Sequence, residues 1–246
     1  MNTWELYRAL SSKSRIAVIA ALREAPLRYS EIMKKTGLST TDLSRQLTRL
    51  STDQIVDKTQ SDQYQLTQYG KIAETTIPLI QFLVDNQVYF NTRDLSSIPT
   101  ALVERIGALR NGTMVNSVYE SMKIQQKVIP TVRKHFSMIT DDLGPAWVDS
   151  TLKLVERGVK IRAIYTKELA EKVSKEAPPK LLAGMDIRTM TPIPLVLGYS
   201  DQHALLCFSS LDGKPDRNHY LFGYDIMFKH WAFHCFNNFW RQAEPV

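Results

Sequence analysis

Short hydroxyl side chains and arginines alternate with leucines between residues 39 and 51. Leu43, Leu47 and Leu50 recur at the spacing of one helical face, which predicts a helix with a buried apolar stripe. The opposite face then carries small polar groups and two guanidinium groups: Thr40, Thr41, Ser44, Arg45, Thr48 and Arg49. Side chains of this kind can hydrogen-bond to base edges and to phosphates, and an arginine can bind guanine through two hydrogen bonds.

Further polar residues flank this helix on both sides. We expect base contacts near the helix N-terminus and phosphate contacts from the remaining positions. The expected base contacts are Thr40, Thr41, Ser44 and Arg45. The helix also offers Thr48, and the expected phosphate contacts are Arg49, Lys58, Gln60, Ser61, Arg28 and Tyr29. Asp42 would repel phosphate, so we predict a capping role for it. A merely solvated helix face remains the alternative for the helix taken alone.

The surrounding sequence predicts the elements that would hold these residues. Ser12 precedes an apolar helix, Ser30 is expected to cap a helix that ends at Gly37, and Ser39 is expected to cap the helix 39–51. Two short strands at 55–56 and 64–66 then enclose a polar tip. This order predicts a winged helix-turn-helix in residues 1–70, with the helix 39–51 and a wing at 57–64 as the DNA-contacting parts.

Charge favours an anionic partner for this N-terminal part. The 246 residues carry a formal net charge of +6, and residues 1–70 hold ten Lys and Arg against seven Asp and Glu. A basic surface that serves only solubility remains open. The two cysteines form no disulfide framework, and no apolar run approaches the roughly 20 residues that span a bilayer. We therefore expect a cytoplasmic protein without a membrane partner.

Residues 71–90 are predicted to form one long amphipathic helix. Its apolar positions offer a surface on which two copies could pair, so a homodimer on a palindromic operator is expected. Residues 91–99 are polar and end in proline, which marks a boundary. The predicted organisation is a winged helix at 1–70, a linking and dimerisation segment at 71–97, and a second domain at 98–246.

Strands and helices alternate in the second half of the chain. Helices are predicted at 101–109, 123–136, 147–157 and 225–242, and strands at 114–119, 159–165, 185–190, 195–199, 203–209 and 219–222. This alternation predicts an α/β domain with a partly parallel sheet, so the fold class of the chain is a two-domain α+β or α/β protein.

An effector pocket in this second domain would lie at the C-terminal ends of its parallel strands. The candidate ligand-binding residues are Trp147, Tyr165, Arg188, Tyr199 and His203, and each could equally be core or surface. His230 and His234, with Cys235 beside them, have a spacing that can hold a metal. The many aromatic residues of the same helix favour packing instead, and we expect neither a metal nor a cofactor.

Residues 4–71 resemble winged-helix regulators of the ArsR type, through Gly37-Leu-Ser-Thr-Thr-Asp-Leu-Ser-Arg-Gln-Leu and Tyr64-Gln-Leu-Thr-Gln-Tyr-Gly70. The remainder resembles the C-terminal domain of archaeal methanogenesis-regulatory proteins. The similar segments are Ile98-Pro-Thr-Ala-Leu-Val-Glu-Arg-Ile-Gly-Ala-Leu, Gly158-Val-Lys-Ile-Arg-Ala-Ile-Tyr and Trp231-Ala-Phe-His-Cys-Phe-Asn-Asn-Phe-Trp. The resemblance implies a transcription regulator with a domain that senses a small-molecule effector. The metal-binding cysteines of ArsR sensors have no counterpart here.

The second half also resembles the phospholipase D-type domain of sugar-sensing archaeal regulators. Active members of that fold use a His-x-Lys pair, whereas His203-Ala-Leu205 lacks the lysine. We therefore expect a degenerate domain that is not an enzyme. Two alternatives stay open: a phospholipase D-like or nuclease enzyme that the winged helix targets, and a winged helix that binds only proteins.

Overall fold

The computed structural model describes residues 2–144 and 147–246. The chain divides into two compact units, Met1–Asn86 and Gln87–Val246. The division falls within residues 71–97, the segment that the sequence predicts as the linking part. Each unit has its own core and is described by itself below.

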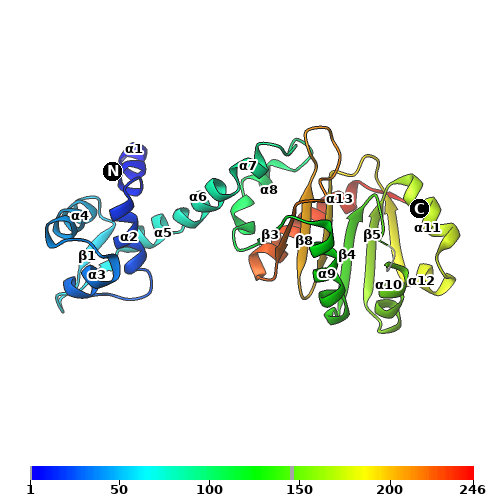
Figure 1. Cartoon of the computed structure of the whole chain (residues 1–246), viewed down its shortest axis with the longest axis horizontal. Helices are drawn as coiled ribbons and strands as arrows, with labels where there is room; N and C mark the ends of the chain where they lie inside the picture. Colours follow the sequence, from blue (N-terminus) through cyan, green and yellow to red (C-terminus); the bar gives the residue numbers. More distant parts are fainter. Residues whose placement is uncertain (1, 145–146) are drawn as a thin grey trace. The chain divides into compact units, whose positions relative to one another are not determined.

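The first unit opens with four helices and a hairpin (Figure 1). The helices are α1 (Thr3–Leu10), α2 (Lys13–Ala21), α3 (Tyr29–Thr36) and α4 (Thr40–Thr52). The antiparallel strands β1 (Val56–Lys58) and β2 (Tyr64–Leu66) form the hairpin. Its core contains fully buried side chains from α2, α3 and α4, including Ile19, Ile32 and Leu43. The order of elements in residues 12–66 agrees with the prediction, and α1 is an addition to it.

The predicted single helix at 71–90 is wrong, because three helices occupy this stretch. They are α5 (Gln68–Glu74), α6 (Thr76–Asp85) and, in the second unit, α7 (Gln87–Phe90). Pro78 explains the first interruption. A proline has no N–H to donate to the carbonyl four residues earlier, here that of Glu74, and α5 ends at Glu74.

The second unit is built on one eight-stranded sheet of order β10-β6-β5-β4-β7-β8-β9-β3. Its strands are β3 (Thr113–Val115), β4 (His135–Thr140), β5 (Lys160–Tyr165), β6 (Met185–Thr189), β7 (Leu195–Ser200), β8 (Ala204–Phe208), β9 (Tyr220–Gly223) and β10 (Glu244–Pro245). Strands β4, β5 and β6 are parallel, and the other pairings are antiparallel. The predicted partly parallel sheet is therefore a mixed sheet that is mostly antiparallel.

Three predicted elements in this unit are wrong. The single helix expected at 101–109 is two short helices, α8 (Thr100–Val103) and the 3₁₀ helix η1 (Ile106–Leu109). The helix expected at 123–136 is α9 (Val118–Val128), followed by the short 3₁₀ helix η2 (Ile129–Thr131) and then by β4. The strand expected at 114–119 ends at Val115, because Ser117 caps α9 by accepting from Glu120 N–H. Pro130, one residue into η2, is a second local reason for α9 to end where it does.

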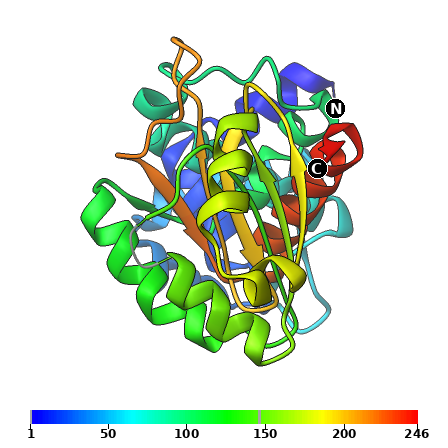
Figure 2. The same cartoon turned by 90° about the vertical axis from the view of Figure 1, so that its right-hand side faces the viewer.

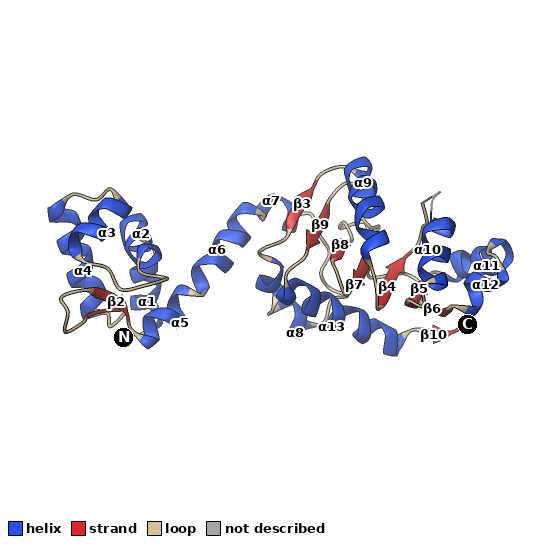
Figure 3. Cartoon of the chain, turned by 90° about the horizontal axis from the view of Figure 1, so that it is seen from below, coloured by secondary structure: helices blue, strands red, loops and turns tan. Residues whose placement is uncertain are grey.

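Helices cover both faces of the sheet (Figures 2 and 3). One face lies under α9 and α10 (Trp147–Glu156), and the opposite face lies over α13 (Ile226–Gln242). The remaining helices are α8 (Thr100–Val103), η1 (Ile106–Leu109), α11 (Lys167–Glu176) and α12 (Pro179–Ala183). α13 buries a row of aromatic side chains that includes Phe228, Trp231 and Phe236. In the central strands β4, β7 and β8, alternate side chains therefore point toward α9 and α10 or toward α13.

Candidate nucleic-acid interface

The N-terminus of α4 is set by a tight turn and a cap. Gly37 has a φ of 69°, a left-handed conformation that glycine adopts without steric cost. Ser39 caps the helix, since its hydroxyl accepts a hydrogen bond from Asp42 N–H at 3.2 Å. The Asp42 carboxylate in turn accepts a hydrogen bond from the Ser39 hydroxyl at 3.0 Å. The predicted capping role of Asp42 thus corresponds to a bond with the hydroxyl of the cap residue.

The outward face of α4 presents the polar side chains that the sequence predicts for it. Leu43, Leu47 and Leu50 are buried in the core, as expected. The exposed residues are Thr40, Thr41, Ser44, Arg45, Thr48 and Arg49. This face therefore carries hydroxyls and guanidinium groups over almost its whole length.

Arg45 is held by an acid on its own helix. Its Nη2 lies 2.6 Å from Asp42 Oδ1, and both side chains are about half exposed, at 58% and 46%. An exposed pair of this kind contributes about 0–1 kcal/mol, so an incoming anion can replace Asp42 at little cost. The pair meanwhile holds Arg45 beside the helix N-terminus.

Tyr29 supports α4 from the preceding helix. Its hydroxyl donates to the Thr40 carbonyl at 2.6 Å, and its ring packs against the core of the unit. Helix α3 begins at Tyr29 rather than after Ser30, so the predicted cap at Ser30 is wrong. The Arg28 backbone N–H instead donates to the Glu31 carboxylate at 2.6 Å, and the Arg28 side chain is exposed.

The hairpin tip is tied together by its own polar side chains. Lys58 Nζ lies 2.5 Å from Asp62 Oδ1, and this hydrogen bond raises the pKa of Lys58 above its ordinary value. The Ser61 hydroxyl lies 3.0 Å from the Thr59 hydroxyl. Gln60 is exposed at the tip. All three predicted contacts, Lys58, Gln60 and Ser61, therefore lie on the solvent side of the hairpin.

Two motifs fasten the hairpin to the helices. The Thr67 hydroxyl caps α5 by accepting from Gly70 N–H at 2.8 Å, and it donates to the Gln54 carbonyl at 2.6 Å. Gly70 passes so close to β1 that an added Cβ would lie 2.0 Å from the Ile55 carbonyl oxygen. The Leu-Thr-x-x-Gly motif therefore fixes where the hairpin projects relative to α4.

A buried polar contact that the sequence does not reveal holds α4 against α2. Arg15 is 8% exposed, and its guanidinium donates to the Gln46 side chain at 3.4 Å and to the Ala9 carbonyl at 2.7 Å. Burial lowers the pKa of Arg15. Gln46 interrupts the leucine stripe of α4 at a buried position, and that interruption is the one signal that could have pointed to a buried partner.

The candidate ligand residues of the second unit fall on opposite faces of its sheet. Trp147 and Tyr165 meet edge to face, with ring centroids 6.3 Å apart, on the face that α9 and α10 cover. Tyr199 packs on Phe236 of α13 instead, and Arg188 donates to the Trp240 carbonyl at 2.8 Å. The five residues therefore do not form one pocket.

His203 lies in the turn between β7 and β8 and is fully buried. Its Nδ1 is 3.1 Å from the Ser200 hydroxyl, and burial lowers its pKa to about 4. Arg162, which is not among the residues predicted from the sequence, lies near Tyr199. Its guanidinium donates to the Tyr199 hydroxyl at 3.0 Å and lies over the rings of Phe236 and Trp240.

No cluster of three or more potential metal ligands occurs among residues 2–144 and 147–246. The rings of His230 and His234 are 6.4 Å apart, and Cys235 is fully buried. No helix within the described part of the chain is long and apolar enough to cross a membrane.

One family model matches a part of the chain that lies in the first unit. Residues 5–78 match the family model described as the HVO_A0261 N-terminal domain, which spans less than a third of the chain. Among curated proteins, none matches this chain.

Three solved structures illustrate the range of structural likeness. TrmBL2, an archaeal chromatin protein with a novel mode of DNA binding, is 15% identical over 100% of both chains, with a TM-score of 0.47. Quinone-bound YodB from B. subtilis is 22% identical over 35% of this chain and 99% of its own, with a TM-score of 0.32. The phospholipase D family member Nuc from Salmonella typhimurium is 10% identical over 55% of this chain and 97% of its own, with a TM-score of 0.38. Because these TM-scores are all below 0.5, none of the three matches supports a conclusion about function.

Proposed function

We propose that the first unit is a winged helix-turn-helix that binds duplex DNA, with α4 in the major groove and the hairpin tip on the backbone. The observation that carries this proposal is the outward face of α4. Its exposed side chains are short hydroxyls and two arginines, and its N-terminal turn is held by Gly37, Ser39 and Tyr29. Short side chains let a helix approach base edges closely, and arginines supply charge and bidentate contacts.

Arg45 has the central role in this proposal. In the free protein its guanidinium is paired with Asp42, so one positive charge of the face is masked. On DNA, the guanidinium leaves Asp42 for a guanine edge or a phosphate. Tyr29 acts differently from the sequence expectation. Because its hydroxyl is already bonded to the Thr40 carbonyl, we assign it to holding α4 rather than to direct phosphate contact.

We also propose that the chain acts as a homodimeric transcription regulator. Helices α5 and α6 expose apolar side chains that a lone monomer would leave in water: Tyr69, Ile72, Ile80, Leu83 and Val84. Contiguous exposed apolar surface is typical of a protein–protein contact, and two copies on a two-fold axis suit paired DNA half-sites. In this proposal the second unit responds to a small-molecule effector.

The phospholipase D-like alternative has less support from the geometry. His203 is the histidine that its chemistry would require. It is fully buried, and the residue two positions later is Leu205, on the buried strand β8. A nucleophile must reach its substrate, so a buried imidazole does not favour this chemistry.

A mobility-shift assay with the upstream region of the gene, and with a random-sequence duplex, tests DNA binding. We expect binding that weakens steeply with salt, since each neutralised phosphate releases counterions. Arg45→Ala should weaken binding by about 1–3 kcal/mol, or roughly 5- to 150-fold. Arg110→Ala is the matched control, because Arg110 is an exposed arginine in the second unit.

Asp42→Asn should have the opposite effect. It removes a negative charge from the DNA-facing side and frees Arg45, while the amide can still accept from the Ser39 hydroxyl. We expect tighter binding to the random duplex.

If low salt brings no binding to either duplex, the proposal is wrong and a protein-binding winged helix is favoured. If binding is unaffected by Arg45→Ala, the role of Arg45 is wrong.

Sedimentation equilibrium tests the dimer separately. Val84 is 62% exposed on α6, so Val84→Asp should not disturb the fold of one copy. We expect the parent chain to sediment as a dimer and the variant as a monomer. Glu104→Asp, an exposed change outside α5 and α6, is the control. A parent chain that stays monomeric at all concentrations would contradict the pairing.

A further inference from the structure

A cavity of about 340 Å³ lies in the second unit, between the sheet and the helices α9 and α10. Its volume is within the range of roughly 300–1,000 Å³ that small-molecule sites occupy. Most of its wall is apolar. The apolar lining includes Met122, Phe136, Met138, Trp147, Val196 and Leu205. Of the ligand candidates expected from the sequence, Trp147 lines this cavity.

Gly198 lines this space without filling it. It lies on β7 opposite Met138 of β4, on the face toward α9 and α10. An added Cβ would approach Leu205 Cδ2 to 3.5 Å and Phe136 Cε2 to 3.8 Å, which are ordinary contacts. The strand would therefore accept a side chain at this position. The glycine keeps room in the cavity without being required by the packing of the sheet.

The polar groups inside the cavity are neutral. Tyr220 is 6% exposed and lines the cavity, and its hydroxyl makes no hydrogen bond to the residues that the structure describes. Thr151, on α10, also lines the cavity and is 2% exposed. Burial raises the pKa of Tyr220, so its hydroxyl stays protonated and available as a donor at neutral pH. The lining also includes the side chains of Ser150 and Gln126.

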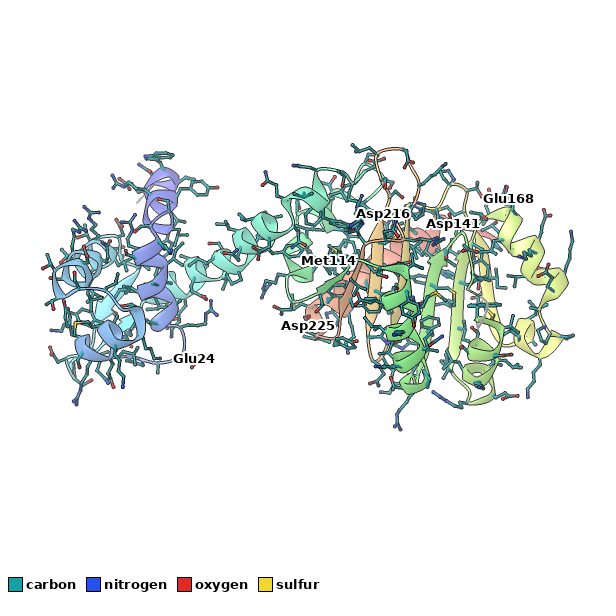
Figure 4. The ribbon with its side chains drawn as sticks, in the orientation of Figure 1. Glu24, Met114, Asp141, Glu168, Asp216 and Asp225 are labelled. Atoms are coloured by element: carbon teal, nitrogen blue, oxygen red, sulfur yellow. The ribbon has the colours of Figure 1, made fainter. Side chains whose placement is uncertain are left out.

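The charged groups near the cavity are at least partly in solvent or paired. Arg217 lines the cavity, but its guanidinium is paired with Asp141. Asp142, the other charged residue of the lining, is exposed. Asp141 and Asp216 lie near the same end of the sheet (Figure 4). A charged ligand group inside the cavity would therefore lose hydration without gaining an unpaired counter-charge.

We infer that this cavity binds an uncharged small amphiphile, with an apolar body against Met138 and Phe136 and one hydroxyl or carbonyl group at Tyr220. The inference gives a chemical class to the effector of the proposed regulator. Its test needs no DNA, so its failure is distinct from a failure of DNA binding.

Calorimetric titration of the full chain with octanol, octanoate and octylamine separates the charge classes at constant chain length. We expect saturable binding of octanol at one site per chain. Binding of the two charged probes should be weaker by at least about tenfold, because each must bury a charge or leave its head group outside. Equal or tighter binding of either charged probe, or no binding of octanol, would overturn the inference.

Two variants locate the site. Gly198→Val fills the cavity from the sheet, and Met122→Trp fills it from α9, where Met122 is 37% exposed. Both should weaken octanol binding by at least about tenfold, since the apolar contact volume is lost. Tyr119→Trp is the matched control, because Tyr119 is on the same helix but is 66% exposed and outside the lining. If Met122→Trp folds and binds octanol as the parent does, the octanol site is elsewhere and the inference is wrong.

Discussion

Gly70→Ala is the sharpest test of how the hairpin is held in the first unit. The added methyl would lie 2.0 Å from the Ile55 carbonyl oxygen and 2.9 Å from its carbonyl carbon. Both atoms belong to the main chain of a fully buried residue, so no side-chain rotation can relieve the contact. Either α5 or β1 must move.

The expected cost follows from two opposing effects. Forcing an extra carbon into a packed interior costs about 1–3 kcal/mol, and a contact with main chain should fall in the upper part of that range. Gly70 is the third residue of α5, so alanine also gains up to about 1 kcal/mol of helix propensity. The net loss in the free energy of unfolding should be about 1–2 kcal/mol. For a unit of this size, that corresponds to roughly 5–15 °C in Tm.

Hydrogen exchange on the full chain measures this loss unit by unit. We expect faster exchange in the hairpin and in α4, with the sheet of the second unit unchanged. Gln68→Ala is the control, since Gln68 is exposed on the same helix and lies outside the proposed pairing surface. Gly70→Ala should also weaken duplex binding, because the hairpin tip is displaced. A variant as stable as the parent would refute the close approach of α5 to β1 and the reasoning built on it.

Two further predictions concern the second unit. Burial lowers the pKa of His203 to about 4. Between about pH 6.5 and 4, His203 therefore stays neutral in the folded protein, whereas it takes up a proton in the unfolded chain. The free energy of unfolding should fall by up to about 3 kcal/mol as the pH is lowered through this window. His203→Gln should remove that part of the pH dependence in denaturant titrations, whereas His230→Gln, at an exposed position, should not. Arg93→Ala breaks a buried ion pair with Asp216. It should cost about 3 kcal/mol by the same measurement, at the lower end for a buried pair, because His219 still contacts Asp216. A loss as small as that of Arg110→Ala would contradict a stabilising role.

The elements of the first unit were predictable because their signals are local. Ser39 as a cap and the leucines of α4 lie within one or two helical turns of the structure that they specify. Helix α1 was missed although its sequence carries a similar signal. Asn2 accepts from Glu5 N–H at 2.9 Å, and the Glu5 carboxylate accepts from Asn2 N–H at 2.7 Å, which is a complete capping box.

The second unit was less predictable because its strands are defined by distant partners. The first two residues of β4 were assigned to the end of a helix and the others to no element, whereas β4 is a central strand between β5 and β7. Its residues Phe136, Met138 and Ile139 are apolar in either conformation. What makes them a strand is the register with Ile161 and its neighbours, more than 20 residues later in the chain.

The same dependence on register explains why the candidate ligand residues did not form one site. Tyr165 pairs with Thr140, and Tyr199 pairs with Ser137 three residues earlier on the same strand, so their side chains point to opposite faces. The candidates were chosen by residue type alone, and aromatic and basic side chains pack on both faces of this sheet. The cavity is lined in part by Gly198, which has no side chain to fill it. The effect of a glycine on a cavity can be judged only when the neighbouring strands show what a side chain at that position would face. At Gly198 a side chain would face the open space beside Met138.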